Sequence, residues 1–179
     1  MEGLEVRKAI PEDIAVLNEL VRESVLGLGA ADYSSEQLAS ALRYLFGIDS
    51  RLVEDGTYYV VEAEKRPVAS GGWSRRRTLF GGDQYAARAD DLLDPQTEPA
   101  RIRAFFVHPD WARRGLGRLL LLECEGAASR SGFRRLELMA TLTGVPLYER
   151  TGFRIVTTLD LELPDGVRFP LTRMGKELV

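Results

Sequence analysis

Residues 101–131 constrain the fold more than any other part of the chain, because they combine a strand, a glycine-rich turn and a helix. The segment RIRAFFVH (101–108) is rich in β-branched and aromatic residues, which is typical of a strand. It leads into HPDWARRGLGRLLL, in which Gly115 and Gly117 stand among arginines. The leucine-rich run that follows predicts a helix over 115–131.

This turn has the properties of an anion site. The first amides of a helix have no partners within it, and with the helix dipole they carry about half a positive charge. Glycines leave room for a ligand beside those amides. The guanidinium groups of Arg113, Arg114 and Arg118 add forked donors that match phosphate oxygens. The turn is therefore predicted to bind a phosphate or pyrophosphate.

Two common phosphate motifs do not match this turn. A P-loop requires Gly-Lys-Ser/Thr, which the sequence lacks. A dinucleotide fingerprint requires a third glycine, and Leu120 occupies that position. Glu137 lies about 20 residues downstream, as a ribose-binding acid does in that fingerprint, but its neighbours belong to a predicted strand. A dinucleotide ligand is therefore disfavoured.

The rest of the chain supplies further strands and helices of one domain spanning residues 1–179. Alternating polarity predicts the strands, and amphipathic spacing with capping signals predicts the helices. Residues 78–100 form a connection much longer than the usual ~4–6 residues, which predicts a functional loop or an insertion. The remaining strands are expected at 4–10, 57–64, 66–75, 133–140, 153–163 and 167–178, and the remaining helices after Pro11, over 34–46 and over 145–152.

Composition excludes several classes of partner. The net charge of −3 gives no general attraction to nucleic acid, and no apolar run approaches the ~18 residues of a membrane span. The charged N-terminal segment is unlike a signal peptide, and the single cysteine, Cys124, permits no internal disulfide, so a cytoplasmic location is expected. Cys124 lies within a predicted helix, where a small buried residue is favoured over a nucleophile.

Two segments resemble the GNAT superfamily of acyl-CoA-dependent N-acetyltransferases. VHPDWARRGLGRLLL is similar to the acyl-CoA-binding motif, although Ala112 stands where the family often has Gln or Arg. PLYERTGFR (146–154) is similar to the family's Leu-Tyr-Glu-Lys-x-Gly-Phe segment. Thr141 replaces the usual Asn seven residues before the tyrosine, Tyr148. The order of the predicted elements agrees along nearly the whole chain.

The resemblance implies an α/β (α+β type) fold with a mixed, mostly antiparallel sheet of six to seven strands, flanked by helices. The fourth and fifth strands, 101–108 and 133–140, would splay apart and admit acetyl-CoA as the co-substrate, with no metal. The pantetheine arm would pair with the backbone of Phe105, Phe106 and Val107 and contact Thr141, and the pyrophosphate would lie on the amides of Arg113, Arg114, Gly115, Leu116, Gly117 and Arg118.

The implied activity is transfer of an acetyl group from acetyl-CoA to a primary amine of a small molecule or peptide, by direct attack in a ternary complex. By the same resemblance Tyr148 is the acid for the leaving thiolate, the alternative being an aromatic residue packed on the sheet edge. The base stays open: Glu62 is one candidate, water is another, and His108 is favoured as a capping or surface residue. A CoA-binding regulatory module without turnover is the alternative function.

The acceptor side is less constrained by the sequence. Trp73 lines the acceptor pocket or fills the core. Arg101, Arg103 and Phe105 alternate, so they are expected to share one strand face. Either these arginines hold an anionic group of the substrate, or they form salt bridges with acids of the 78–100 loop. The first alternative, with the loop beside the acceptor, favours a zwitterionic amine over a polyamine. The sequence leaves a homodimer open.

Overall fold

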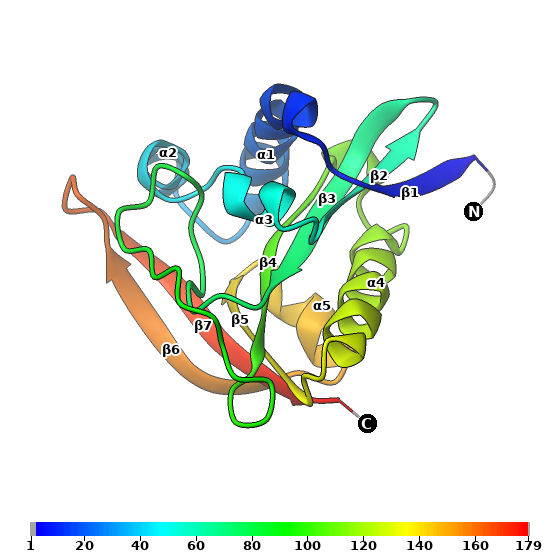
Figure 1. Cartoon of the computed structure of the whole chain (residues 1–179). Helices are drawn as coiled ribbons and strands as arrows, with labels where there is room; N and C mark the ends of the chain where they lie inside the picture. The colour runs from blue at the N-terminus through cyan, green and yellow to red at the C-terminus, as the bar shows by residue number, and fades with distance from the viewer. Residues whose placement is uncertain (1–2, 179) are drawn as a thin grey trace.

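The computed structural model describes residues 3–178, and its centre is a mixed seven-stranded sheet in the order β1-β2-β3-β4-β5-β7-β6 (Figure 1). Neighbouring strands are antiparallel except for β4 and β5, which are parallel. This architecture confirms the predicted fold class. The strands are β1 (Leu4–Lys8), β2 (Tyr58–Ala63), β3 (Arg66–Ser74), β4 (Ala100–Val107), β5 (Arg135–Thr141), β6 (Arg154–Glu162) and β7 (Arg168–Glu177).

Helices cover both faces of the sheet and bury a separate apolar cluster on each. On one face, α1, α2 and α3 pack with Tyr58, Phe106 and Phe169. On the other face, α4 and α5 pack with Ile102 and Leu138. None of the helices in the described part of the chain is long and apolar enough to cross a membrane. The helices are α1 (Ile14–Gly29), α2 (Ser35–Tyr44), α3 (Ser50–Glu54), α4 (Leu116–Arg130) and α5 (Val145–Arg150), with short 3₁₀ turns η1 (Pro11–Asp13) and η2 (Pro109–Trp111).

Local signals account for the helix starts. Ser34 and Gln37 form the predicted capping box of α2, each side chain bonding the other residue's amide. The helix ends at Tyr44, two residues before the predicted end. The sequence reasoning missed α3, whose N-cap is Asp49: this carboxylate accepts from the amide of Arg51 at 3.1 Å.

The parallel pairing of β4 with β5 is very short. It consists of Ala100 opposite Leu136 and Arg101 opposite Glu137, after which the strands diverge. At this junction the buried Arg101 guanidinium is ion-paired with Glu137, which also accepts from Nε of Arg173 at 2.7 Å. The predicted splay is therefore present, and it begins at a buried ionic cluster.

A bulge in β4 changes which side chains share a face. Gly71 of β3 lies opposite both Ala104 and Phe105, and Ala104 adopts a left-handed φ of 56°. A two-against-one bulge reverses the alternation beyond it. Arg103 consequently points toward α3, whereas Phe105 packs with the α4 cluster. The expectation that Phe105 shares a face with the strand arginines was wrong, because it assumed an uninterrupted strand.

The connection between β3 and β4, coloured green in Figure 1, folds back on itself. Arg76 and Leu92 form an isolated antiparallel bridge, and the amide of Thr78 donates to the carbonyl of Ala89 at 3.1 Å. Further along, the amide of Gly82 donates to the carbonyl of Leu45 at 2.9 Å. The loop is thereby fixed against the segment between α2 and α3.

Candidate active site

The divergence of β4 and β5 creates a cleft of about 620 Å³. One end is the glycine–arginine turn between η2 and α4, and the other end lies among α1, the residues after α2 and the β3–β4 loop. The side walls are the free edge of β4, the end of β5 and the first turn of α5. The cleft thus connects the predicted anion site to a chamber on the opposite side of the sheet.

The turn has the backbone geometry of an anion site. Arg113 and Gly115 both adopt left-handed φ values, 63° and 85°, and α4 begins at Leu116. The carbonyl of Gly115 accepts from the amide of Leu119, so the amides of the first helical turn, including Gly117, lack helical partners. A Cβ on Gly115 would meet no atom within 4 Å, so the space beside this turn is open.

Gly117 lies where the start of α4 packs against α5. A Cβ at Gly117 would lie 2.8 Å from Cδ2 of Leu147, so a side chain at this position would require the Leu147 side chain to shift. The sequence prediction had assigned both glycines to ligand access. The structure shows open space at Gly115 and tight packing at Gly117.

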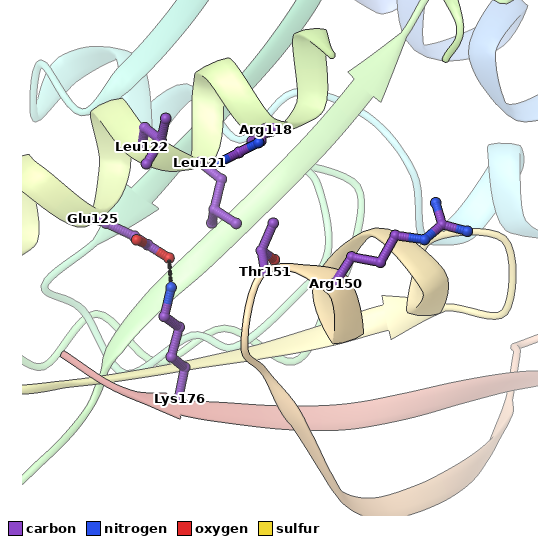
Figure 2. A pocket seen from close by; sticks show the side chains of 7 residues that line it. All are labelled: Arg118, Leu121, Leu122, Glu125, Arg150, Thr151 and Lys176. Atoms are coloured by element: carbon purple, nitrogen blue, oxygen red, sulfur yellow. Dashed lines mark hydrogen bonds and ion pairs between the residues drawn. The ribbon is translucent and has the colours of Figure 1, made fainter. Parts of the chain in front are cut away.

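Positive charge gathers at the turn end of the cleft. Arg113, Arg118 and Arg150 line it there, whereas Arg114 stacks over the Trp111 ring, with its Cζ 4.7 Å from the ring centroid, and does not line the cleft. Figure 2 shows a smaller adjoining pocket of about 220 Å³, which Arg118 of α4 and Arg150 of α5 also line. In that pocket the Lys176 ammonium is paired with the Glu125 carboxylate at 2.6 Å, as the dashed line marks.

Tyr148 lies across the splay from β4. Its ring centroid is 6.3 Å from that of Phe105 and 5.6 Å from that of Phe153, and the residue is 8% exposed. The described residues offer its hydroxyl no hydrogen-bond partner within the chain. Burial raises the pKa of Tyr148, so the phenol is protonated at neutral pH. Tyr148 therefore presents a neutral O–H donor in the cleft wall.

The predicted pantetheine contacts lie along the same opening. Phe105, Phe106 and Val107 all line the cleft on the part of β4 that has lost β5 as a partner. The Val107 amide donates to Oγ of Ser24 at 3.1 Å. Thr141 ends β5, and its Oγ1 accepts from the amide of Gly144 at 3.1 Å, so it anchors the start of α5 while lining the cleft.

Four other residues named in the sequence analysis lie outside the cleft. The Glu62 carboxylate accepts from Nη2 of Arg7 at 2.6 Å, on the β1–β2 side of the sheet. Trp73 is 3% exposed and packs edge-on against Phe133, with 6.1 Å between centroids. Cys124 is fully buried, and burial raises its thiol pKa. His108 acts as a cap: its Nδ1 accepts from the amide of Asp110 at 3.2 Å.

Arg103 lines the cleft, but its guanidinium is already bonded within the protein. Nη2 donates to Asp49 at 2.8 Å and to the carbonyl of Gly81 at 2.7 Å, and Nη1 donates to the carbonyl of Thr78 at 3.1 Å. Asp49 is also ion-paired with Arg88 of the loop. Sequence reasoning missed Asp49, although an Asp directly before a short helix is an N-cap signal.

Three of the loop acids are paired with other arginines. Asp83 pairs with Arg88 at 3.0 Å, Asp90 with Arg51 at 3.0 Å, and Glu98 with Arg77 at 2.7 Å. Both the strand arginines and the loop acids thus take part in salt bridges, but mostly not with each other. Among residues 3–178, the charged side chains that line the cleft are Arg103, Arg113, Arg118 and Arg150, with no carboxylate.

The sequence was compared with protein families and with characterised proteins. The sequence profile of the family described as "Acetyltransferase (GNAT) domain" matches residues 88–178, half of the chain. A spermidine N(1)-acetyltransferase of Thermoplasma acidophilum is 24% identical over 160 residues, which is 87% of this chain and 91% of that protein.

Solved structures show the same fold. A GCN5-related N-acetyltransferase from Rhodopseudomonas palustris has a TM-score of 0.72 at 23% identity, covering 99% of this chain and 98% of that one. The PaiA N-acetyltransferase of Thermoplasma acidophilum, solved with coenzyme A, has a TM-score of 0.64 at 20% identity, covering 97% and 98% of the two chains.

Proposed function

The chain belongs to the GNAT acetyltransferase family, and from this we propose that it transfers the acetyl group of acetyl-CoA to a primary amine by direct attack in a ternary complex. The observation that supports the proposal is one continuous cleft, which extends from the glycine–arginine turn past Tyr148 to a separate chamber. This arrangement suits two substrates that meet at Tyr148 from opposite ends.

Acetyl-CoA is assigned to the turn end. Arg113, Arg118 and Arg150 supply positive charge, and the unpaired amides at the start of α4 supply donors for a pyrophosphate. The free edge of β4 over Phe105–Val107 offers backbone groups to the amides of a pantetheine arm, except for the Val107 amide, which donates to Ser24, and Thr141 lies on the facing strand. When bound there, acetyl-CoA supplies the thioester carbonyl that the amine attacks.

Direct attack is favoured over a covalent acyl-enzyme. Cys124, the only cysteine in the sequence, is buried beneath α4 and does not line the cleft. Burial raises the pKa of its thiol, which leaves it protonated and unreactive. Transfer therefore proceeds from thioester to amine without a protein thiol.

Tyr148 is the proposed catalytic acid. The thiolate that leaves in the reaction needs a proton, and a neutral phenol with a free hydroxyl beside the cleft can donate it. Because the Tyr148 hydroxyl has no partner among the described side chains and backbone groups, it is available for this bond.

The proton of the incoming amine must leave by another route. For an amine with a lysine-like pKa of about 10.4, forming the neutral species at pH 7 costs about 4.6 kcal/mol. Glu62 lies outside the cleft and is bonded to Arg7, and the described cleft-lining residues include no carboxylate or histidine. We therefore assign proton removal to water in the cleft.

An amine acceptor is also consistent with the Thermoplasma relative, whose name specifies spermidine. The test is incubation of the protein with acetyl-CoA and a panel of primary amines, with free thiol and acetylated amine both measured. Acetylated amine that accumulates together with free thiol supports the proposal. Tight acetyl-CoA binding without acetylation of any amine would instead establish the CoA-binding module.

A further inference from the structure

The chamber beyond Tyr148 is walled almost entirely by apolar side chains. From it we infer that the acceptor is a small primary amine carrying an aryl or branched aliphatic group and no second charge. This inference rests on the proposed function and names its substrate class. The walls come from α1, α2 and the residues flanking it, the β3–β4 loop, β5 and β7: Val25, Leu28, Tyr33, Leu38, Leu45, Phe46, Leu79, Phe80, Met139 and Phe169.

Aromatic rings give this chamber its shape. Phe46 packs edge-on against Phe169 and Phe106, with centroids 5.4 and 6.0 Å apart, and Phe169 stacks on Tyr33 at 4.2 Å. The Tyr33 hydroxyl is occupied, because it donates to the carbonyl of Pro170 at 2.7 Å and accepts from the amide of Leu142 at 2.8 Å. The ring cluster therefore offers faces and edges to an apolar group rather than polar contacts.

The loop wall of the chamber is held in place by buried polar groups. The Arg103 guanidinium bonds the carbonyls of Thr78 and Gly81 on either side of Leu79 and Phe80, and Asp49 neutralises it. Arg103 is thus a positioning residue for these two apolar side chains. This role differs from the expected contact with a substrate anion.

The electrostatics of the cleft exclude a polycation. Its described lining contains no carboxylate; among the loop acids, Asp83, Asp90 and Glu98 are paired with arginines, and Asp91 and Asp94 do not line the cleft. A polyamine would have to place its second ammonium in an apolar chamber, or beside Arg113 and Arg118 at the other end. A charge removed from water without a partner is strongly disfavoured. An amine with a single nitrogen is neutral when it attacks the thioester, so it places no unpaired charge in the chamber.

The experiment compares acceptors at fixed acetyl-CoA: 2-phenylethylamine, 3-methylbutylamine, phenylalanine and spermidine. We expect kcat/KM for 2-phenylethylamine and 3-methylbutylamine to exceed that for spermidine and for phenylalanine by at least about 10-fold. If spermidine or phenylalanine is the best acceptor, the inference is wrong while the proposed function stands. If no amine is acetylated, both are wrong.

Variants link the preference to the chamber. Phe80→Glu places a carboxylate in the wall, so kcat/KM for 2-phenylethylamine should fall about 10-fold and the ratio of spermidine to 2-phenylethylamine should rise. Leu28→Glu tests the same wall from α1, in case Phe80→Glu disturbs the loop. Leu92→Glu is the matched control, because Leu92 lies on the same loop, is 62% exposed and does not line the cleft.

Acetyl-CoA affinity, measured by calorimetry, shows whether each variant is folded. A folded Phe80→Glu and a folded Leu28→Glu that both keep the wild-type acceptor ratio would overturn the assignment of the chamber. The same ratio change in Leu92→Glu would also overturn it, because the effect would then come from net charge alone.

Discussion

Removing the Asp49 carboxylate should destabilise the protein more than removing any exposed acid of the loop. The Arg103 and Asp49 side chains are only 2% and 3% exposed, and Arg88 contacts the same carboxylate. Asp49→Ala would leave the buried Arg103 guanidinium without its counter-charge and close to the guanidinium of Arg88. Breaking a buried ion pair in this way costs about 3–5 kcal/mol.

Urea unfolding measures this loss. With an m-value of about 2 kcal/mol per molar urea, a loss of 3–5 kcal/mol lowers the midpoint by about 1.5–2.5 M. Asp83→Ala is the control, because Asp83 bonds the same Arg88 but its side chain is 44% exposed. An exposed ion pair contributes about 0–1 kcal/mol to stability, so the urea midpoint of Asp83→Ala should fall by about 0.5 M or less.

The double variant Asp49→Ala/Arg103→Met tests the cause. Replacing both charges removes the stranded guanidinium, although the carbonyls of Thr78 and Gly81 also lose their donor. We expect the double variant to be more stable than Asp49→Ala alone. A double variant as unstable as the sum of the single changes, or an Asp49→Ala midpoint equal to that of Asp83→Ala, would refute this reasoning.

Three further predictions concern the catalytic cleft. Tyr148→Phe should lower turnover about 10²-fold with acetyl-CoA affinity unchanged; wild-type turnover in a chemistry-limited assay would return Tyr148 to a packing role. Because burial raises the pKa of Tyr148, its proton is retained at higher pH than in a free phenol, so a pH–kcat profile should show no Tyr148-dependent fall below about pH 10. Gly117→Asp should weaken acetyl-CoA binding at least about 10-fold, roughly 1.4 kcal/mol; calorimetry of Gly117→Ala separates the clash with Leu147 from the added charge, and equal losses in the two variants would contradict an electrostatic origin.

Local sequence signals were sufficient for much of the fold. The Ser34–Gln37 capping box marked α2, and the glycine–arginine turn marked the start of α4. The splay of β4 and β5 was expected only from the resemblance to the GNAT superfamily, because no local pattern in residues 101–108 predicts it. These features depend on residues close together in the chain, or on a motif of fixed spacing.

Long-range pairing explains what the sequence did not reveal. The bulge at Ala104 could not be predicted from the order of residue types in β4, because no particular residue type is required where the register changes. Arg103 finds its partner in Asp49, 54 residues away, and a composition-based pairing with the nearby loop acids named the wrong partners. Glu62 was one candidate for the base, but it lies outside the cleft, where Arg7 of β1 is its partner.

The short contact between β4 and β5 divides the sheet into two parts, β1–β4 and β5–β7, which few backbone hydrogen bonds connect. Beyond Arg101 and Glu137 no backbone pairing connects the described strands β1–β4 with β5–β7 across the splay. An extended ligand lying along the free edge of β4 completes the sheet in place of the missing strand. Its binding energy therefore becomes folding energy, about 2.7 kcal/mol at a ligand concentration one hundred times Kd. Amide hydrogen exchange in β4 and β5 should therefore slow together when acetyl-CoA is added.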